Sequence, residues 1–375
     1  MSRTPVLIAA RRTPIGNAGH GFADLSVTDL AAPVLRSVHE AVRASGIDAE
    51  VDDVVLGNCL GPGGDPARVA ALRAGLGIEV PGVTVDRQCG SGLDAVMQAV
   101  TRVRADDGDL LLAGGVESAS TAPWRFWPPV GDAEPVRYTR APFAPPEFPD
   151  PDMGVAADDL ARKLGIGRER QDAYAARSHA LAAASDFSAE IVPIGGIERD
   201  QRIRAGMTIE RLARLRPSFT TDGTATAGNS CGISDGAAAL AVTTEEQASG
   251  LPALRVLGCA VAGADPALPG LAPAPAIAKL LRRTGFAISD IGVVEITEAF
   301  AAVVLAVADE LGIDEARICP QGGAIAMGHP WGASGAILLV RLASRMLAPD
   351  GPELGLAACA IGGGQGIAML VEKVA

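Results

Sequence analysis

The sequence predicts an α/β fold, in which helices cover a sheet, and it predicts that this unit occurs twice in one chain. The apolar segment 83–85 leads into a helical stripe from Leu93 to Val103, and an apolar strand at 109–115 follows a turn. That order is typical of a sheet covered by helices. It returns 243 residues later, where Ser334-Gly335 and Asp350-Gly351 repeat the dipeptides Ser91-Gly92 and Asp107-Gly108. We expect two similar halves to pack about a pseudo-twofold axis and to leave a cleft where their loops meet.

The remaining elements follow in order along the chain. The apolar stretch between Arg3 and Arg11 predicts a first or edge strand. In the second half, a helical stripe from Ala336 to Leu347 precedes an apolar strand that runs into glycines at 354–364. Between the halves, residues 120–152 are rich in proline and aromatics, which is typical of a functional loop or lid, and 154–184 read as helical. We therefore expect a first half at 1–118 plus 246–265, an inserted loop domain at 119–245, and a second half at 266–375.

Composition excludes several classes of function. The 375 residues contain 32 Lys and Arg against 44 Asp and Glu, and the net charge of −12 argues against nucleic acid or an anionic membrane as a partner. Hydrophobic residues make up 48%, enough for a sizeable core. No apolar run reaches the ~18 residues of a membrane span, and no signal peptide is evident. The six cysteines form no C-x-x-C pair, so we expect no zinc, reduced thiols and a cytoplasmic protein.

Cys89 is the strongest candidate for chemistry. It lies in "VDRQCGSGLDAV", where a strand joins a helix, and unpaired backbone N–H groups and the helix dipole favour a thiolate there. Gly90 and Gly92 let other groups approach closely. The alternative is a small buried apolar cysteine, which is the interpretation we prefer for Cys59, Cys259 and Cys319.

His329 is the candidate base. It lies in the glycine-rich segment "QGGAIAMGHPWGASGA", directly before a helix that Pro330 begins. A base that activates a thiol must be near it in space rather than in sequence, and the duplication supplies that proximity because both loops open equivalent helices. The other histidines read as surface or structurally satisfied residues: His20, His39 and His179.

Two further segments have a functional and a plain structural interpretation. The turn "IGGGQG" at 361–366 can offer backbone N–H groups, including that of Gly362, to a developing oxyanion, or it is a tight turn between strands. The segment "TEAFAAVVLAVADELG" begins at Thr297 and places Glu298 in the first turn of an apolar helix, or Thr297 caps that helix.

Taken together, these segments resemble the thiolase family over nearly the whole chain. Matching segments include "AARRTPIG", "RQCGSGLDAV", "AGGVES", "TAGNSCGISDGAAA", "TEAFA" and "GGAIAMGHPWGASGA". The resemblance implies a five-layer α-β-α-β-α sandwich of two duplicated halves with an inserted loop domain. It also implies a homodimer or homotetramer that cleaves 3-oxoacyl-CoA with CoA or condenses two acyl-CoAs, as in lipid metabolism. No metal and no permanently bound cofactor are implied, since coenzyme A thioesters are substrates.

The resemblance also implies roles for individual residues. Cys89 matches the nucleophile that holds the acyl group, and His329 matches its base. The N–H groups of Cys89 and Gly362 match the oxyanion hole, and Thr297 stands where an asparagine commonly positions a water. The residues that match the CoA-binding and acyl-pocket positions are Met153, Ala227, Gly228 and Cys231, the last in place of a serine; Asp152 replaces a histidine.

One departure concerns the second catalytic cysteine, which in the family directly precedes the hydrophobic residue and three glycines and moves the α-proton. Here Ala360 holds that position and Cys359 stands one residue earlier. Neighbours on a strand point to opposite faces, so either this acid–base group is lost or a bulge re-aims Cys359. The alternatives for function are a non-condensing acyl-CoA thioesterase or acyltransferase and a non-catalytic acyl-CoA-binding scaffold.

Overall fold

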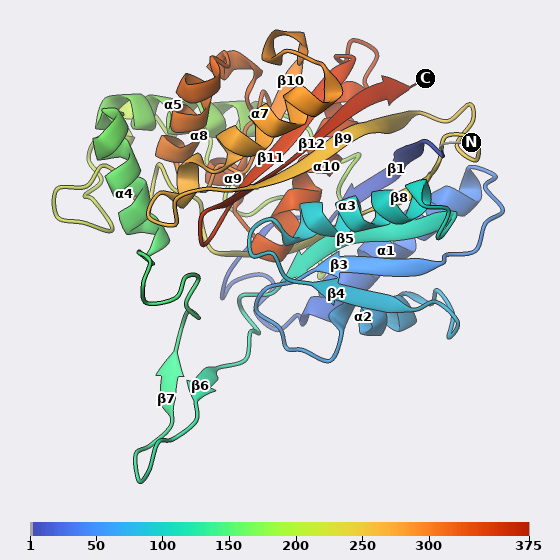
Figure 1. The fold of residues 1–375 in the computed structure, drawn as a ribbon, viewed down its shortest axis with the longest axis horizontal. Helices are drawn as coiled ribbons and strands as arrows, with labels where there is room; N and C mark the ends of the chain where they lie inside the picture. Colours follow the sequence, from blue (N-terminus) through green and yellow to red (C-terminus); the bar gives the residue numbers. More distant parts are fainter. Residues whose placement is uncertain (1–2, 375) are drawn as a thin grey trace.

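A computed structural model describes residues 3–374 and shows a mixed sheet with helices on its faces (Figure 1). The strand order is β10-β11-β12-β9-β1-β8-β5-β3-β4. The strands on the first-half side are β1 (Pro5–Arg12), β8 (Ser234–Thr244), β5 (Leu110–Glu117), β3 (Asp53–Gly57) and β4 (Gly82–Val85), and β2 (Gly16–Asn17) pairs with β8. Those on the second-half side are β9 (Ala253–Gly263), β12 (Gln365–Val374), β11 (Leu354–Ile361) and β10 (Val293–Ile296).

The helices complete five layers around four hydrophobic clusters. In the middle layer, α3 (Ser91–Arg104) packs against α10 (Trp331–Met346), and both contact strands of the sheet. The outer face of the first half is covered by α1 (Val27–Ala44) and α2 (Pro66–Ala74), and that of the second by α7 (Pro273–Thr284) and α8 (Ala301–Leu311). The short helices are α9 (Ala324–Met327), η1 (Pro269–Leu271), η2 (Ile288–Asp290) and η3 (Glu315–Arg317). The predicted sandwich is therefore confirmed.

The two half-sheets join at β1 and β9, which pair over only two residue pairs. By contrast, β9 pairs with β12 over its whole length. This pairing differs from the expected assignment of 246–265 to the first half, because the hydrogen-bonded partner of β9 lies in the second. The expected loop domain 119–245 likewise contains β8, which pairs with β5 and β1 inside the first half.

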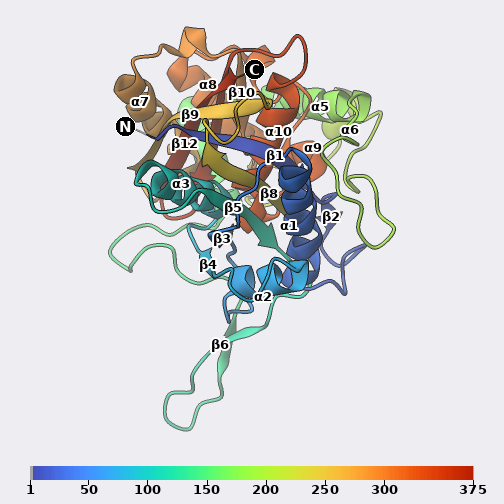
Figure 2. The ribbon, with the colours of Figure 1, turned by 90° about the vertical axis from the view of Figure 1, so that its right-hand side faces the viewer.

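The inserted segment carries helices and a hairpin. The predicted helical region is α4 (Met153–Leu164) and α5 (Arg168–Ala184), separated at Gly165, and α6 (Ile209–Leu212) follows. The hairpin of β6 (Arg125–Trp127) and β7 (Val136–Tyr138) projects away from the body of the molecule (Figures 1 and 2). Within residues 3–374, none of the helices has the length and apolarity to cross a membrane.

Candidate active site

Cys89 lies in a tight turn between β4 and α3. The preceding Gln88 adopts a left-handed backbone conformation with φ of 47°, which non-glycine residues rarely adopt without support from their surroundings. Ser91 supplies that support, since its hydroxyl donates to the Gln88 carbonyl oxygen at 2.6 Å and accepts the N–H of Arg87 at 2.8 Å. The turn therefore holds the half-buried Cys89 at the N-terminal end of α3.

The thiolate that the helix N-terminus favours at Cys89 is opposed by burial. Burial raises the pKa of the Cys89 thiol well above its ordinary value, and the neighbouring thiols of Cys359 and Cys231 raise it further. The backbone N–H of Cys89 opposes this shift, but desolvation outweighs it. The resting thiol is protonated, so Cys89 needs a base in order to react.

The loops that carry Cys89 and His329 come together because α3 and α10 touch backbone to backbone. A Cβ atom added at Gly92 would lie 2.8 Å from the Gly332 carbonyl oxygen, and one added at Gly335 would lie 2.4 Å from the Leu93 nitrogen. Only glycine permits this approach. Cys89 stands three residues before Gly92 and His329 three residues before Gly332, so both loops open at the same place.

His329 is held in the orientation of a neutral base. Its backbone N–H donates to the Gly232 carbonyl oxygen at 3.1 Å, and its Nδ1 lies 2.6 Å from the Ser334 hydroxyl oxygen. Its Nε2 is buried and has no hydrogen-bond partner within residues 3–374. Burial lowers the pKa of His329 to about 4. The imidazole is therefore neutral near pH 7, and an Nδ1–H that donates to Ser334 leaves the Nε2 lone pair available.

The glycine turn between β11 and β12 packs beside the Cys89 loop. A Cβ atom at Gly90 would lie 2.5 Å from the Ile361 side chain, which directly precedes Gly362. On the other side, the Phe143 ring covers this turn, because a Cβ atom at Gly362 would lie 2.6 Å from it. Gly363 and Gly364 have φ of 80° and 75°, which favour glycine. Backbone N–H groups of this turn thus lie next to the nucleophile loop.

Cys359 reaches Cys89 without a bulge. The pairing of β11 with β12 is continuous through Ile361, so Cys359 and Ala360 point to opposite faces. The Cys359 thiol nevertheless donates to the Cys89 carbonyl oxygen at 3.2 Å. The contact needs no bulge, because the Cys89 peptide packs on the face of β11 that Cys359 occupies. Burial raises the pKa of Cys359 to about 12, and Ala360 is partly exposed.

Thr297 follows β10 and is buried. Its hydroxyl lies close enough to the Cys359 thiol to lower the pKa of that thiol, although it makes no hydrogen bond of ordinary geometry in the part of the chain described. Helix α8 begins at Ala301, so Glu298 is not in its first turn as expected. Glu298 instead accepts hydrogen bonds from Tyr174 and Ser178 of α5, at 2.8 and 2.7 Å, and so connects the inserted segment to this loop.

The loop that contains Ala227, Gly228 and Cys231 also meets the site. The Cys231 N–H donates to the Ala299 carbonyl oxygen at 2.9 Å, beside Thr297 in the chain. Arg202 organises this loop by donating to the carbonyl oxygens of Ala227 and Ser230, at 3.1 and 3.2 Å. The sequence did not indicate Arg202, because its partners are backbone atoms that carry no residue-type signal.

Met153 begins α4. The next residue, Gly154, lies against the Phe219 ring, since a Cβ atom there would be 2.0 Å from it. Phe219 in turn makes an edge-to-face contact with Phe300, their ring centres 5.7 Å apart. Phe300 forms a backbone bridge with Ser230, so this aromatic pair links Met153 to the Cys231 loop.

Glu117 is a buried carboxylate that the sequence did not single out. It accepts backbone N–H groups of Cys59, Leu60 and Gly332, each at 3.1 Å. Burial raises its pKa to about 7. Glu117 therefore ties the loop after β3 to the first turn of α10. Cys59, interpreted from the sequence as an inert core residue, lies against the nucleophile loop, because its thiol donates to the Gln88 carbonyl oxygen at 3.1 Å.

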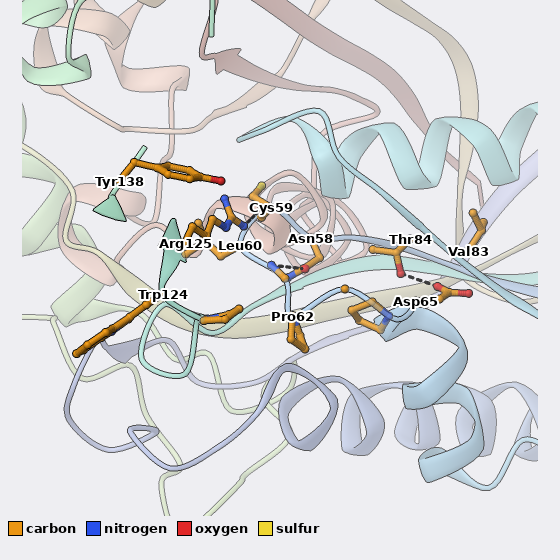
Figure 3. A pocket seen from close by; sticks show the side chains of 14 residues that line it. Asn58, Cys59, Leu60, Pro62, Asp65, Val83, Thr84, Trp124, Arg125 and Tyr138 are labelled. Carbon is orange, nitrogen blue, oxygen red and sulfur yellow. Dashed lines mark hydrogen bonds between the residues drawn. The ribbon is translucent and has the colours of Figure 1, made fainter. Parts of the chain in front are cut away.

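A hollow of about 790 Å³ lies beside this loop rather than at the Cys89 thiol (Figure 3). It is lined by the loop 58–66, by Val83 and Thr84 of β4, and by Trp124, Arg125 and Tyr138 of the hairpin segment. The six thiols are unbridged. No group of metal-ligating side chains occurs in the described part of the chain.

Comparisons with known proteins cover the whole chain. Residues 5–246 match the family model described as "Thiolase, N-terminal domain", and residues 251–373 match "Thiolase, C-terminal domain". The chain is 41% identical, over 99% of both proteins, to "Putative acetyl-CoA C-acetyltransferase YhfS" of Bacillus subtilis. It is also 41% identical to "Acetyl-CoA acetyltransferase" of Pseudomonas aeruginosa, over 98% of this chain and 99% of that protein. The crystal structure of the Bacillus anthracis acetyl-CoA acetyltransferase is similar over 100% of this chain and 99% of that one, with a TM-score of 0.90 and 36% identity.

Proposed function

The chain belongs to the thiolase family and is a thiolase-type acyltransferase, and we propose that Cys89 carries the acyl group as a thioester while His329 takes and returns its proton. The observation that carries this assignment is the buried neutral imidazole of His329, whose Nε2 is uncommitted and whose loop opens beside that of Cys89. A protonated thiol beside a neutral imidazole is the resting form that a base-activated nucleophile requires.

In the first step, His329 Nε2 takes the proton from Cys89 Sγ as the sulfur attacks the thioester carbonyl carbon of an acyl-CoA. The oxyanion that forms accepts hydrogen bonds from the N–H groups of Cys89 and Gly362. When the C–S bond to CoA breaks, the leaving thiolate takes the proton back from His329. The acyl group is then bound to Cys89 Sγ and free CoA is released.

The second step concerns the carbon–carbon bond. In cleavage of a 3-oxoacyl-CoA, Cys89 attacks the 3-oxo carbonyl with its proton on His329, the bond between C2 and C3 breaks, and the acyl-CoA enolate that leaves needs a proton. CoA-SH then attacks acyl-Cys89 and supplies the proton that replaces it, Cys89 takes its own proton back from His329, and condensation is the reverse. We assign the proton that the enolate takes to the thiol of Cys359. Its thiol lies 3.2 Å from the Cys89 carbonyl oxygen and near the Thr297 hydroxyl, whereas Ala360 has no group that can hold a proton. While it holds the proton of Cys89 at Nε2, His329 donates to the thioester oxygen of the departing enolate, and Thr297 assists by positioning a water.

The test of the first step is the mass of the intact protein after incubation with acetyl-CoA. Wild type should gain one acetyl group, removable by CoA, and Cys89→Ala should gain none. His329→Ala should acylate more slowly by about 10²- to 10⁴-fold, the usual contribution of a general base. An acetyl adduct that persists in Cys89→Ala contradicts the proposal.

The test of the second step separates acylation from carbon–carbon bond chemistry. Cys359→Ala should still form the acetyl adduct at the wild-type rate, and it should lose cleavage of acetoacetyl-CoA by about 10²-fold or more. If Cys359→Ala cleaves acetoacetyl-CoA normally, Cys359 is not the acid–base group. Ala360→Cys in the Cys359→Ala background then reports whether a thiol at position 360 restores cleavage.

Coenzyme A thioesters as substrates are supported by charge as well as by family. Six arginines lie within residues 199–216, next to the Cys231 loop, in a chain of net charge −12. The phosphates of CoA are anionic and favour such a segment. We propose that the pantetheine arm passes Met153 and the loop of Ala227, Gly228 and Cys231. Acylation by acetyl-CoA should therefore be more efficient than acylation by acetyl-pantetheine, and it should weaken with added salt.

We further propose that the protein is a homo-oligomer with an interface at β4. This strand ends the sheet, and an uncovered edge is prone to pair with another chain. Apolar side chains around it are exposed: Val69, Leu72, Ile78 and Val83. Light scattering should report a dimer or tetramer for wild type, and Val83→Lys should shift it toward the monomer. A monomeric wild type at micromolar concentration contradicts this assignment.

A further inference from the structure

A small internal cavity lies between α10 and β10, next to the hydrogen-bond partner of His329. Its volume is about 20 Å³, enough to hold one water molecule. Its polar lining comes from Glu295, Thr297, Ser334 and Arg341. The mechanism above uses Thr297 and His329, but it gives no role to Glu295 or Arg341, although both side chains are almost completely buried.

The strand pattern aims Glu295 at this cavity. Residues Val293, Glu295 and Thr297 alternate with Val294 and Ile296, so the first three share one face. Val293 packs in the core that contains side chains of α10, whereas Val294 and Ile296 pack in the outer core of the second half. Glu295 is 1% exposed, so its carboxyl group has been removed from water and turned toward α10.

The cavity is surrounded by polar groups that lack partners. The Thr297 hydroxyl and the Arg341 Nε are buried and have no hydrogen-bond partner among residues 3–374. The Ser334 hydroxyl lies 2.6 Å from His329 Nδ1; in the Nδ1–H tautomer it accepts that proton, and its own proton then needs an acceptor. One water in the cavity can accept the Ser334 proton and donate to the Glu295 carboxylate on the other side, since buried waters make two to four hydrogen bonds.

We propose that Glu295 is a positioning residue that acts on His329 through one cavity water and the Ser334 hydroxyl. It holds the Nδ1–H tautomer of His329 and stabilises the imidazolium that forms when Cys89 gives up its proton. The proton itself moves only between Cys89 and His329. This inference rests on the proposed role of His329 as the base, and it adds a positioning carboxylate on β10.

The electrostatics of Glu295 suit this role. Burial raises the pKa of Glu295 to about 8, so the carboxyl titrates close to the pH at which the imidazole must act. The surrounding groups oppose one another, as Arg341 and the Cys319 thiol lower this pKa while Glu298 and Glu190 raise it. The ionised carboxylate strengthens His329 as a base, and the protonated form does not. Glu295 and His329 should therefore titrate as a coupled pair.

The test measures the rate of Cys89 alkylation by iodoacetamide as a function of pH in the full-length protein. Wild type should show a rise with an apparent pKa near 8, below the ionisation of Cys89 itself. Glu295→Gln should lose that rise and react about tenfold more slowly, the equivalent of one pKa unit of base strength. Glu295→Asp retains the charge and should retain the rise. The matched control is Ile337→Val, which changes the apolar lining of the same cavity and should leave the profile in place.

Ser334→Ala cuts the proposed connection and should give the same loss as Glu295→Gln, with no further loss in the double variant. If Glu295→Gln does not fold by circular dichroism, Ser334→Ala decides alone. If Ser334→Ala and wild type give superimposable pH profiles of alkylation, the inference is wrong. His329→Ala distinguishes the two levels: if it leaves alkylation unchanged, the base assignment itself fails. If it slows alkylation while Glu295→Gln does not, only the role of Glu295 fails.

Discussion

One methyl group added at Gly92 should lower kcat/KM strongly and the free energy of unfolding only slightly. The Cβ atom of Gly92→Ala would lie 2.8 Å from the Gly332 carbonyl oxygen and 2.9 Å from the Ala336 nitrogen. Both are backbone atoms of α10, so no flexible side chain can move aside. Ordinary contact begins at 3.4 Å, and α3 must therefore withdraw from α10 by about 0.6 Å. Because each helix carries a reactive loop at its start, the same withdrawal separates Cys89 from His329.

The two effects of Gly92→Ala differ in size. Alanine favours a helix over glycine by about 1 kcal/mol, whereas an added methyl in a packed interior costs about 1–3 kcal/mol. The net loss in the free energy of unfolding is therefore about 0–2 kcal/mol. A misplacement of about 1 Å at a catalytic pair costs on the order of 10²-fold in rate. We expect kcat/KM for acetoacetyl-CoA cleavage to fall by at least about tenfold in a protein that remains folded.

Urea unfolding and kcat/KM for the same preparation give both quantities. Gly263→Ala is the matched control, because no described atom lies within 4 Å of its added Cβ; it should change neither quantity appreciably. Gly335→Ala should be more severe than Gly92→Ala, since its Cβ would lie only 2.4 Å from the Leu93 nitrogen. A folded Gly92→Ala with the wild-type kcat/KM would refute the view that the glycine contact sets the distance between nucleophile and base.

The other expected outcomes concern burial and the glycine turn. Burial lowers the pKa of His329 from 6.5 to about 4, so the unfolded chain binds a proton that the native state excludes; stability should fall by about 3 kcal/mol as pH drops through that range, and urea titrations of His329→Gln should show a shallower loss. Glu190→Gln leaves the buried guanidinium groups of Arg12 and Arg341 short of a carboxylate, and urea unfolding should report a loss of about 3–5 kcal/mol. Phe143→Ala uncovers the Gly362 turn; kcat/KM should fall about tenfold with little change in Tm, because Phe143 is partly exposed, and unchanged kinetics would count against the packing role of its ring.

Local pattern was sufficient to predict the order of elements and the position of two glycine-rich loops at helix starts. Cys89 and His329 each stand where glycines surround a helix start, and that signal needs no knowledge of the partner. The half-sheet to which β9 belongs was not predictable in this way, because an alanine- and valine-rich strand is compatible with either half-sheet. The start of α8 was also missed, since Glu298 is held by Tyr174 and Ser178 from a distant helix rather than by the local helix dipole.

The influence of burial on the Cys89 thiol was not predictable for a related reason. A helix N-terminus is visible in the sequence and lowers a thiol pKa, but desolvation depends on what packs over the site in three dimensions. Here α10, β11 and the Cys231 loop all approach the same turn, and burial is the largest influence on Cys89. The balance between these two effects is decided by tertiary packing, which local pattern does not report.

Two departures from the family pattern are best understood together. A cysteine moved by one residue along β11 reaches the opposite face of the strand, which in this fold is the face against the Cys89 peptide. The neighbour it meets there is residue 297, where a threonine stands in place of the usual asparagine. Burial raises the pKa of the Cys359 thiol, and the Thr297 hydroxyl lowers it in part. The threonine and the displaced cysteine therefore form one compensated arrangement, in which the proposed acid–base group approaches Cys89 from the side of its own loop.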